Sequence, residues 1–153
     1  MPNSYKNSQT PPPIMQGSPP PIDQRLPLID WDRPPWNRWA FQRVREFLPT
    51  APIRKGPQVS GLHANLQDIG QIHFHTPMGG TKSIDQMIDD TYTDGLLICL
   101  DGKVIHESYY NGMQPETVHL LQSVSKSITA TAAAGLFEEG LIDPQAPITH
   151  YLP

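Results

Sequence analysis

Proline is unevenly distributed along this chain of 153 residues, and its distribution limits where a core can form. Of the 18 prolines, 13 lie in residues 1–60, where apolar residues are sparse and scattered. Such a stretch cannot bury enough apolar surface to offset its conformational entropy. The segment best suited to form a core is residues 83–153, which at about 70 residues is a marginal size for a domain on its own.

Residues 1–33 are predicted to form a proline-rich, disordered tail, with proline runs at 11–13 and 19–21. A polyproline II ligand for a partner domain is the less favoured alternative. The N-terminus lacks the apolar segment of a signal peptide, and no window reaches the ~18 apolar residues of a membrane span. We therefore expect a cytoplasmic protein with no membrane partner. A formal net charge of −4 and the lack of a basic stripe argue against a nucleic-acid partner.

Two residue types that often carry chemistry are given structural interpretations. Cys99 is the only cysteine, so no internal disulfide is expected, and its apolar neighbours favour a small buried hydrophobe over a reactive thiol. His73 and His75 have the spacing to share one face of a strand and bind a metal. A metal site needs a third ligand, and none is convincing nearby, so no metal site is predicted.

Residues 34–82 are predicted to hold an anchor helix followed by loops. Apolar residues recur at helical spacing over 36–48, where Asn37 is the expected cap and Pro49 ends the pattern. The aromatic residues at 36, 39 and 41 are interpreted as an anchor onto a core in preference to a ligand platform. Residues 49–82 show no clear period and predict loop with at most a short strand.

Residues 83–153 have the strongest signals of regular structure. Ser83 and Gln86 have capping-box spacing, which predicts a helix over about 84–93. The β-prone runs GLLICL and KVIHESYY, separated by Asp-Gly, predict a hairpin. The segment SKSITATAAAGLFEEG predicts a helix that ends at Gly140, and its small side chains suit close packing inside a domain.

The candidate chemistry lies at the start of that last helix, where Ser123 precedes Lys126 by three residues. A serine hydroxyl is a weak nucleophile and needs a base, and residues three apart share one helix face. We expect burial and the positive helix end to favour the neutral amine of Lys126. Free N–H groups at this end are expected to help stabilise an oxyanion, which suits acyl transfer through an ester on Ser123.

The alternative is an ordinary helix start, in which Ser123 or Ser125 caps the helix and Lys126 is solvated. A bare S-x-x-K spacing occurs by chance in a chain of this size. The preceding hairpin and the small-residue face that follows favour chemistry, but these residues alone leave both interpretations open.

Three separated blocks resemble the class C β-lactamase-like, or penicillin-recognising, serine hydrolases. They are PPWNRWAF at 34–41, TYTDGLLICLDGKVIHESYYNGM at 91–113 and HLLQSVSKSITATAAAGLFEEGLIDPQAPITHYLP at 119–153. The resemblance is nearest to the branch of the 6-aminohexanoate-dimer hydrolases, which cleave amides of short linear oligomers. It covers residues 34–153 and leaves the tail unmatched.

The resemblance implies an α/β (α+β), β-lactamase/transpeptidase-like fold, with an antiparallel sheet flanked by helices and a helical domain. It implies that Ser123 is the acylated nucleophile and Lys126 its proton-transfer partner. It implies a small-molecule amide or ester substrate and no metal or organic cofactor. Residues 83–153 would then be the start of an incomplete hydrolase domain.

Members of this family also use a tyrosine in a Y-x-N/S motif roughly a hundred residues after the serine. Tyr109-Tyr110-Asn111 has this pattern but lies before Ser123, so we predict that it is not catalytic. We expect the chain to be an N-terminal fragment that is inactive alone. Two other functions stay open: a non-catalytic binding or sensor protein with this fold, and an interaction protein that acts through its proline-rich tail.

Overall fold

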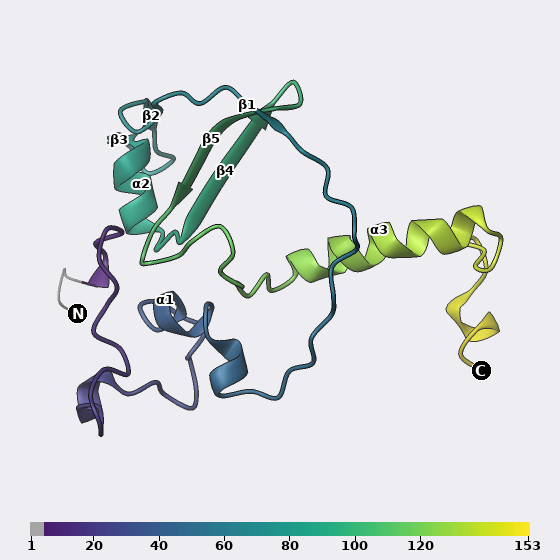
Figure 1. Cartoon of the computed structure of the whole chain (residues 1–153), viewed down its shortest axis with the longest axis horizontal. Helices are drawn as coiled ribbons and strands as arrows, with labels where there is room; N and C mark the ends of the chain where they lie inside the picture. Colours follow the sequence, from purple (N-terminus) through teal and green to yellow (C-terminus); the bar gives the residue numbers. More distant parts are fainter. Residues whose placement is uncertain (1–4) are drawn as a thin grey trace. The chain divides into compact units, whose positions relative to one another are not determined.

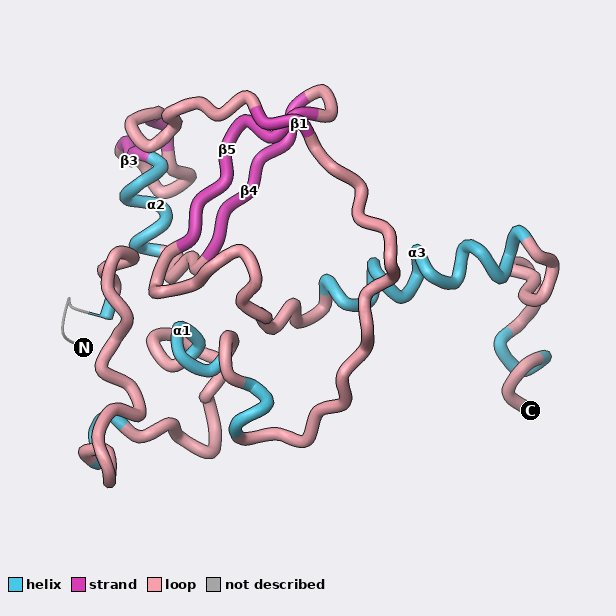
Figure 2. The backbone as a smooth tube through the Cα atoms, viewed as in Figure 1, coloured by secondary structure: helices cyan, strands magenta, loops and turns pink. Residues whose placement is uncertain are grey.

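The computed structural model describes residues 5–153, and the chain divides into two compact units, Met1–His119 and Leu120–Pro153. Figure 1 shows that all five strands lie in the first unit, whereas the second is built on one long helix. Loops join the elements, and they are long in the first part of the chain (Figure 2). The strands form a three-stranded sheet of order β1-β5-β4 and a separate two-stranded sheet, β2-β3.

The predicted hairpin is confirmed and forms most of the larger sheet. Strand β4 (Gly95–Leu100) pairs antiparallel with β5 (Lys103–Tyr109). The turn residues Asp101 and Gly102 both have positive φ, at 50° and 74°. A type I′ turn requires this conformation at both central positions, and Asp-Gly adopts it readily. The short strand β1 (His63–Ala64) adds to β5 in parallel.

Cys99 does not occupy the buried position that its apolar neighbours suggested. It lies on β4 as a free, exposed thiol. A register shift between Ile98 and Cys99 interrupts the alternation of the strand. The described residues cover little of the side chains of β4, and Leu97 and Leu100 are exposed as well.

The capping box predicted at Ser83 is confirmed. The Ser83 hydroxyl accepts a hydrogen bond from the Gln86 N–H at 3.1 Å, and the Gln86 side chain accepts one from the Ser83 N–H at 2.9 Å. Helix α2 (Ile84–Asp90) follows and is shorter than predicted, since Tyr92 turns the chain with φ +55°. Ile88 of α2 and Val104 of β5 are both buried in the core of the first unit.

The segment before α2 contains more strand than predicted. Strands β2 (His73–His75) and β3 (Thr81–Ser83) pair antiparallel, so residues 49–82 include three short strands where at most one was expected. The turn between β2 and β3 uses Gly79 and Gly80, both with positive φ. Strands of two or three residues are too short for side-chain alternation to reveal them in the sequence.

The predicted continuous helix over 36–48 is wrong. Only α1 (Asn37–Ala40) and a 3₁₀ turn, Val44–Glu46, are helical. Arg43 breaks the run with φ −134° and ψ 23°, and the side chain of Asn37 does not cap the helix. The aromatic residues at 36, 39 and 41 are half-buried, and Ala40 and Arg38 beside them are buried. Packing around these two side chains decided the local structure, against the helical spacing.

Residues 5–15, the N-terminal segment and part of the predicted tail 1–33, pack against other segments of the first unit instead of lying free. The Arg38 guanidinium donates to the carbonyls of Tyr5 and Asn7 at 2.8 and 2.7 Å. The Ser8 N–H donates to the Asp89 carboxylate at 2.8 Å. Ile14 is buried as well. This segment gains its order from polar contacts to distant residues, which composition does not reveal; residues 1–4 lie outside the described residues.

Helix α3 (Val124–Glu138) confirms the helix predicted in the second unit. It ends as predicted at Gly140, where φ is +71°. The Leu141 N–H donates to the Leu136 carbonyl at 2.9 Å and the Gly140 N–H to the Phe137 carbonyl at 3.1 Å. These two bonds form a Schellman motif, which satisfies carbonyls at the helix end.

The expectation that α3 is buried is not met, since none of its residues is buried. Ile128 and Leu136 of its predicted packing face are 56% and 40% exposed. Among the described residues, the contacts of α3 are local, and alanine side chains cover little area on their own.

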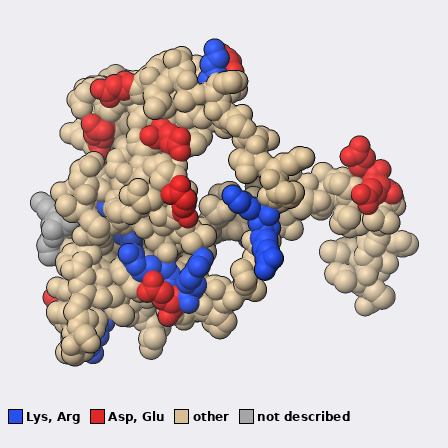
Figure 3. Space-filling model, in the orientation of Figure 1, with Lys and Arg blue, Asp and Glu red and all other residues tan. Residues whose placement is uncertain are grey.

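Charged side chains are a minor part of the surface. Figure 3 shows uncharged surface over most of the visible face, with small acidic and basic groups between. No helix in the part of the chain that the structure describes is long and apolar enough to cross a membrane.

Candidate active site at the start of helix α3

Ser123 stands at the N-terminal boundary of α3 with helical dihedral angles, φ −70° and ψ −10°. Its hydroxyl does not cap the helix. This argues against the interpretation of Ser123 as an ordinary capping residue, because a cap takes extended dihedral angles and accepts a backbone N–H. The hydroxyl is instead directed to another side chain.

That side chain is Lys126, one helical turn further on. Its Nζ donates to the Ser123 Oγ at 3.3 Å. The structure thus brings together the two residues that the sequence placed three apart, within hydrogen-bond distance. Both are exposed, so residues 120–153 do not supply the burial that was expected to favour the neutral amine.

The residue before the candidate nucleophile is strained. Gln122 has φ +48°, in the left-handed region that residues with a Cβ rarely adopt. Such backbone strain clusters at functional sites, where the surrounding fold holds it in place. Sequence reasoning missed this feature, since glutamine has no preference for positive φ and so gives no signal.

The backbone N–H groups at the helix start are less available than predicted. Val124, Ser125 and Lys126 donate to carbonyls three residues earlier, at 3.0–3.2 Å. The N–H of Ser123 itself has no hydrogen-bond acceptor within residues 5–153. The candidate oxyanion donor is therefore the N–H of the serine and not those of the first helical turn.

The Y-x-N match at residues 109–111 lies at the end of β5, and its side chains form hydrogen bonds within the first unit. The Tyr109 hydroxyl donates to the Glu107 carboxylate, which raises the pKa of the tyrosine. A tyrosine that acts as a base needs the opposite shift, since the phenolate must form easily. Asn111 is buried, and its side chain donates to the Arg38 carbonyl and, at 3.0 Å, to Asp94.

This asparagine belongs to a buried polar cluster that the sequence did not indicate. Asp94 accepts from Asn111 through one carboxylate oxygen and contacts the His119 Nε2 at 3.0 Å through the other. Arg38 is 1% exposed, and burial lowers its pKa, against the opposing effect of Asp94. The four residues are up to 81 positions apart, from 38 to 119, so no local pattern could have revealed them.

The histidine pair predicted not to bind metal lies on β2, with His73 and His75 both exposed. His75 Nδ1 lies 3.4 Å from the Thr81 hydroxyl. Within residues 5–153, no group of three or more histidine, cysteine, aspartate or glutamate side chains is arranged to hold a metal ion.

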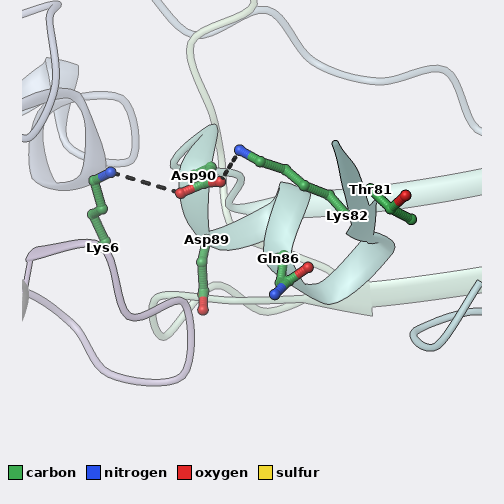
Figure 4. A pocket seen from close by; sticks show the side chains of 6 residues that line it. All are labelled: Lys6, Thr81, Lys82, Gln86, Asp89 and Asp90. Atoms are coloured by element: carbon green, nitrogen blue, oxygen red, sulfur yellow. Dashed lines mark hydrogen bonds and ion pairs between the residues drawn. The ribbon is translucent and has the colours of Figure 1, made fainter. Parts of the chain in front are cut away.

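A polar hollow of about 400 Å³ borders α2 in the first unit. Figure 4 shows Asp90 between Lys6 and Lys82, with which it forms ion pairs. The hydrogen bond from Lys82 is the main cause that lowers the pKa of Asp90. Both cations are paired with the same carboxylate, and Asp89, the other carboxylate that lines the hollow, accepts from the Ser8 N–H.

Comparison with known proteins shows similarity both in the fold and in the sequence around Ser123. The sequence profile of the beta-lactamase family matches residues 82–153. The chain is 36% identical over 128 residues to the 6-aminohexanoate-dimer hydrolase of Paenarthrobacter ureafaciens, a match that covers 83% of this chain and 31% of that protein. It is 48% identical over 40 residues to the mitochondrial serine beta-lactamase-like protein of Homo sapiens, which covers 26% of the chain and 7% of the relative.

A solved structure, described as "Putative 6-aminohexanoate-dimer hydrolase from Bacillus anthracis", shares the fold with a TM-score of 0.70 at 24% identity. The alignment covers 80% of this chain and 32% of that one. The predicted α/β class is thereby confirmed. The chain spans about a third of the length of the first relatives it matches. The profile match and these likenesses together show that the chain resembles the beta-lactamase family, and over residues 82–153 it matches the sequence profile of that family.

Proposed function

We propose that the protein carrying this chain is a serine hydrolase, in which Ser123 is the acylated nucleophile and Lys126 accepts its proton. The observation that carries the proposal is the 3.3 Å contact from Lys126 Nζ to Ser123 Oγ, at a serine whose hydroxyl caps no helix. The family match over residues 82–153 supports it, because this family is named for a hydrolytic reaction.

The proposed first step is acylation. Ser123 Oγ forms a bond to the substrate carbonyl carbon while its proton passes to the neutral amine of Lys126. The carbonyl oxygen becomes an oxyanion, which the unpaired N–H of Ser123 is suited to stabilise. The C–N or C–O bond then breaks, and the leaving group takes the proton. Water attacks the ester on Ser123 in the second step and releases the acid and the free serine.

We propose amides of short linear oligomers as the substrate class, with esters as the alternative. The support is the 36% identity to a 6-aminohexanoate-dimer hydrolase, which reaches over 83% of this chain. An amide bond in such a dimer has an amine leaving group. The proton that Lys126 receives from Ser123 is available to protonate that amine.

The test is covalent labelling of the full-length natural protein with a fluorophosphonate probe. Trypsin cleaves after Lys103 and Lys126, so one peptide, 104–126, contains Ser108, Ser123 and Ser125. Fragment-ion mass spectrometry is expected to place the adduct on Ser123. S123A should lose the label, whereas S125A, which changes a serine two positions away, should keep it. An adduct on Ser125, or labelling that persists in S123A, contradicts the assignment.

Turnover is measured with the linear dimer of 6-aminohexanoate and with p-nitrophenyl acetate. Release of 6-aminohexanoate supports amide hydrolysis, and release of p-nitrophenol alone supports an esterase. An adduct on Ser123 that forms with either compound and is not hydrolysed indicates a binding protein with the same fold and contradicts an enzyme.

A further inference from the structure

An aromatic hollow in the first unit has no role in the chemistry proposed for Ser123. Its volume is about 450 Å³, within the range of pockets that hold small organic molecules. Three aromatic rings, those of Trp31, Trp39 and Phe47, line it, and Met15 and Leu26 contribute apolar wall. Residues 31, 39 and 47 come from a loop, from α1 and from the end of a 3₁₀ turn.

The three rings form one connected group centred on Phe47. The ring centroids of Trp31 and Phe47 lie 5.1 Å apart at 70°, and those of Trp39 and Phe47 lie 6.2 Å apart at 33°. Edge and tilted contacts of this kind hold rings in fixed positions. All three rings are half-buried, so each keeps part of its surface accessible to a ligand.

The charge of the hollow is negative. Glu46 is the one charged residue among the described residues that line it. A carboxylate beside electron-rich ring faces disfavours an anion and favours a cation, since cations are attracted to aromatic faces. The same walls are otherwise apolar, which favours a ligand with a hydrocarbon part.

A cation of the chain already uses these two groups. The Arg43 guanidinium carbon lies 5.3 Å from the Trp39 ring centroid, and Arg43 Nε lies 3.9 Å from a Glu46 carboxylate oxygen. The ring and the carboxylate are therefore positioned to act together on one positive charge. Arg43 itself does not line the hollow, and its side chain is 40% exposed.

We propose that this hollow binds a linear primary alkylammonium ion, with the ammonium group between Glu46 and the Trp39 face and the alkyl chain along Met15 and Leu26. The polar hollow beside α2 differs in its lining, because the two lysines paired with Asp90 line that hollow themselves (Figure 4), whereas Arg43 does not line the aromatic one. The site is independent of the chemistry proposed for Ser123. An alkylammonium ligand would compete with Arg43 for the same ring and carboxylate.

The probe is n-hexylammonium chloride, titrated into the protein at its natural length while tryptophan fluorescence is recorded. Two ligands of the same chain length, n-hexanol and hexanoate, serve as neutral and anionic comparisons. We expect saturable binding of hexylammonium with half-saturation at about 1 mM or below. Hexanol should bind at least about 5-fold more weakly, because it lacks the cation–π and carboxylate contacts of the ammonium group. Hexanoate should bind more weakly still. Equal binding of hexylammonium and hexanol, or no saturation, overturns the proposal.

Variants separate this site from non-specific binding. E46Q, an exposed position whose change keeps side-chain size, should weaken hexylammonium about 5-fold and leave hexanol unchanged. E138Q, an equally exposed glutamate in α3, is the matched control and should change neither. R43Q removes the internal competitor and should tighten hexylammonium about 3-fold. Weaker binding in R43Q, or no effect of E46Q, contradicts the assignment.

The tryptophans give an independent check, because two of the three line the hollow and Trp36 does not. W39L should abolish the fluorescence response to hexylammonium, whereas W36L should keep it. The circular dichroism spectrum of each variant shows whether its fold is retained. A response that survives in W39L and disappears in W36L would place the ligand elsewhere.

Discussion

The internal contacts that stabilise the first unit of this chain differ in kind from those that stabilise the second. In residues 5–119, buried polar side chains join segments that are far apart in sequence, and Arg38 contacts Tyr5 and Asn7 while Asn111 contacts Asp94. Within residues 121–153 the hydrogen bonds are local, as in the bond from the Asp143 N–H to the Tyr151 hydroxyl, which spans 8 residues. The first unit depends on tertiary contacts, and the second on helix geometry.

This difference explains where sequence reasoning succeeded. The Ser123–Lys126 pair lies in the second unit, where the spacing of three residues along a helix is enough to set the contact. The polar cluster lies in the first unit, where chain folding brings Arg38, Asp94 and Asn111 together. Chemistry carried by one helix is readable from sequence, whereas chemistry assembled from several segments is not.

The largest expected effect tests whether local geometry is sufficient for the proposed chemistry. K126A removes the proton acceptor of Ser123 and should slow acylation by a fluorophosphonate about 10²- to 10⁴-fold, the usual contribution of a positioned base. The rate of acylation is measured by quenching the labelling reaction at a series of times and recording in-gel fluorescence. The matched control is K103A, which changes an exposed lysine of β5. A rate unchanged in K126A would show that the 3.3 Å contact is incidental.

The second prediction concerns the contacts of the first unit. R38M keeps an apolar stem but leaves the carbonyls of Tyr5 and Asn7 without their donor. Loss of the buried hydrogen bond to Tyr5 and of the partly buried one to Asn7 should lower the free energy of unfolding by about 2–4 kcal/mol. Urea unfolding followed by tryptophan fluorescence measures this change. R45M, at an exposed arginine of the neighbouring 3₁₀ turn, should stay within about 0.5 kcal/mol of the parent, and a similar loss in both variants would contradict the role of Arg38.

The third prediction compares a helix end in each unit. S83A removes the cap of α2 and should cost about 1 kcal/mol. G140A forces an L side chain to φ +71° at the end of α3 and should also cost about 1 kcal/mol, there as fraying of the last turn. Amide hydrogen exchange of residues 84–90 and 132–138 reports the two losses separately. Exchange that increases equally in both segments in either variant would mean that the two ends do not act locally.

The smallest effect concerns pH. Since Lys82 and Lys6 hold the pKa of Asp90 below its ordinary value of 3.8, the pairing contributes stability above that pH and loses it as the pH falls below it. The N-terminal segment should therefore exchange its amides faster at about pH 3 than at about pH 5, after correction for the intrinsic rate. D90N should show a smaller pH difference. An identical difference in the two proteins would assign the loosening to other groups.

Several features needed no tertiary information, because their causes are local. The Asp101-Gly102 turn favours positive φ at both positions, so it predicted the hairpin, and the pair Ser83 and Gln86 predicted the capping box that the structure contains. Other features were mispredicted because packing overrides propensity. The run at 36–48 has helical spacing but breaks at Arg43, and Cys99 lies in an apolar run but is exposed.

By itself, the sequence determined the hairpin and two helices, α2 from its capping box and α3 from the glycine at its end. It also determined that Ser123 and Lys126 share one helical face. Each depends on residues within a few positions of one another, where backbone geometry fixes the outcome. Only the tertiary structure decided that residues 5–15 pack onto Arg38, that Asp94 and Asn111 are buried together and that three aromatic rings line one hollow. These contacts join distant segments, and their free energy arises from burial and pairing that no local pattern encodes.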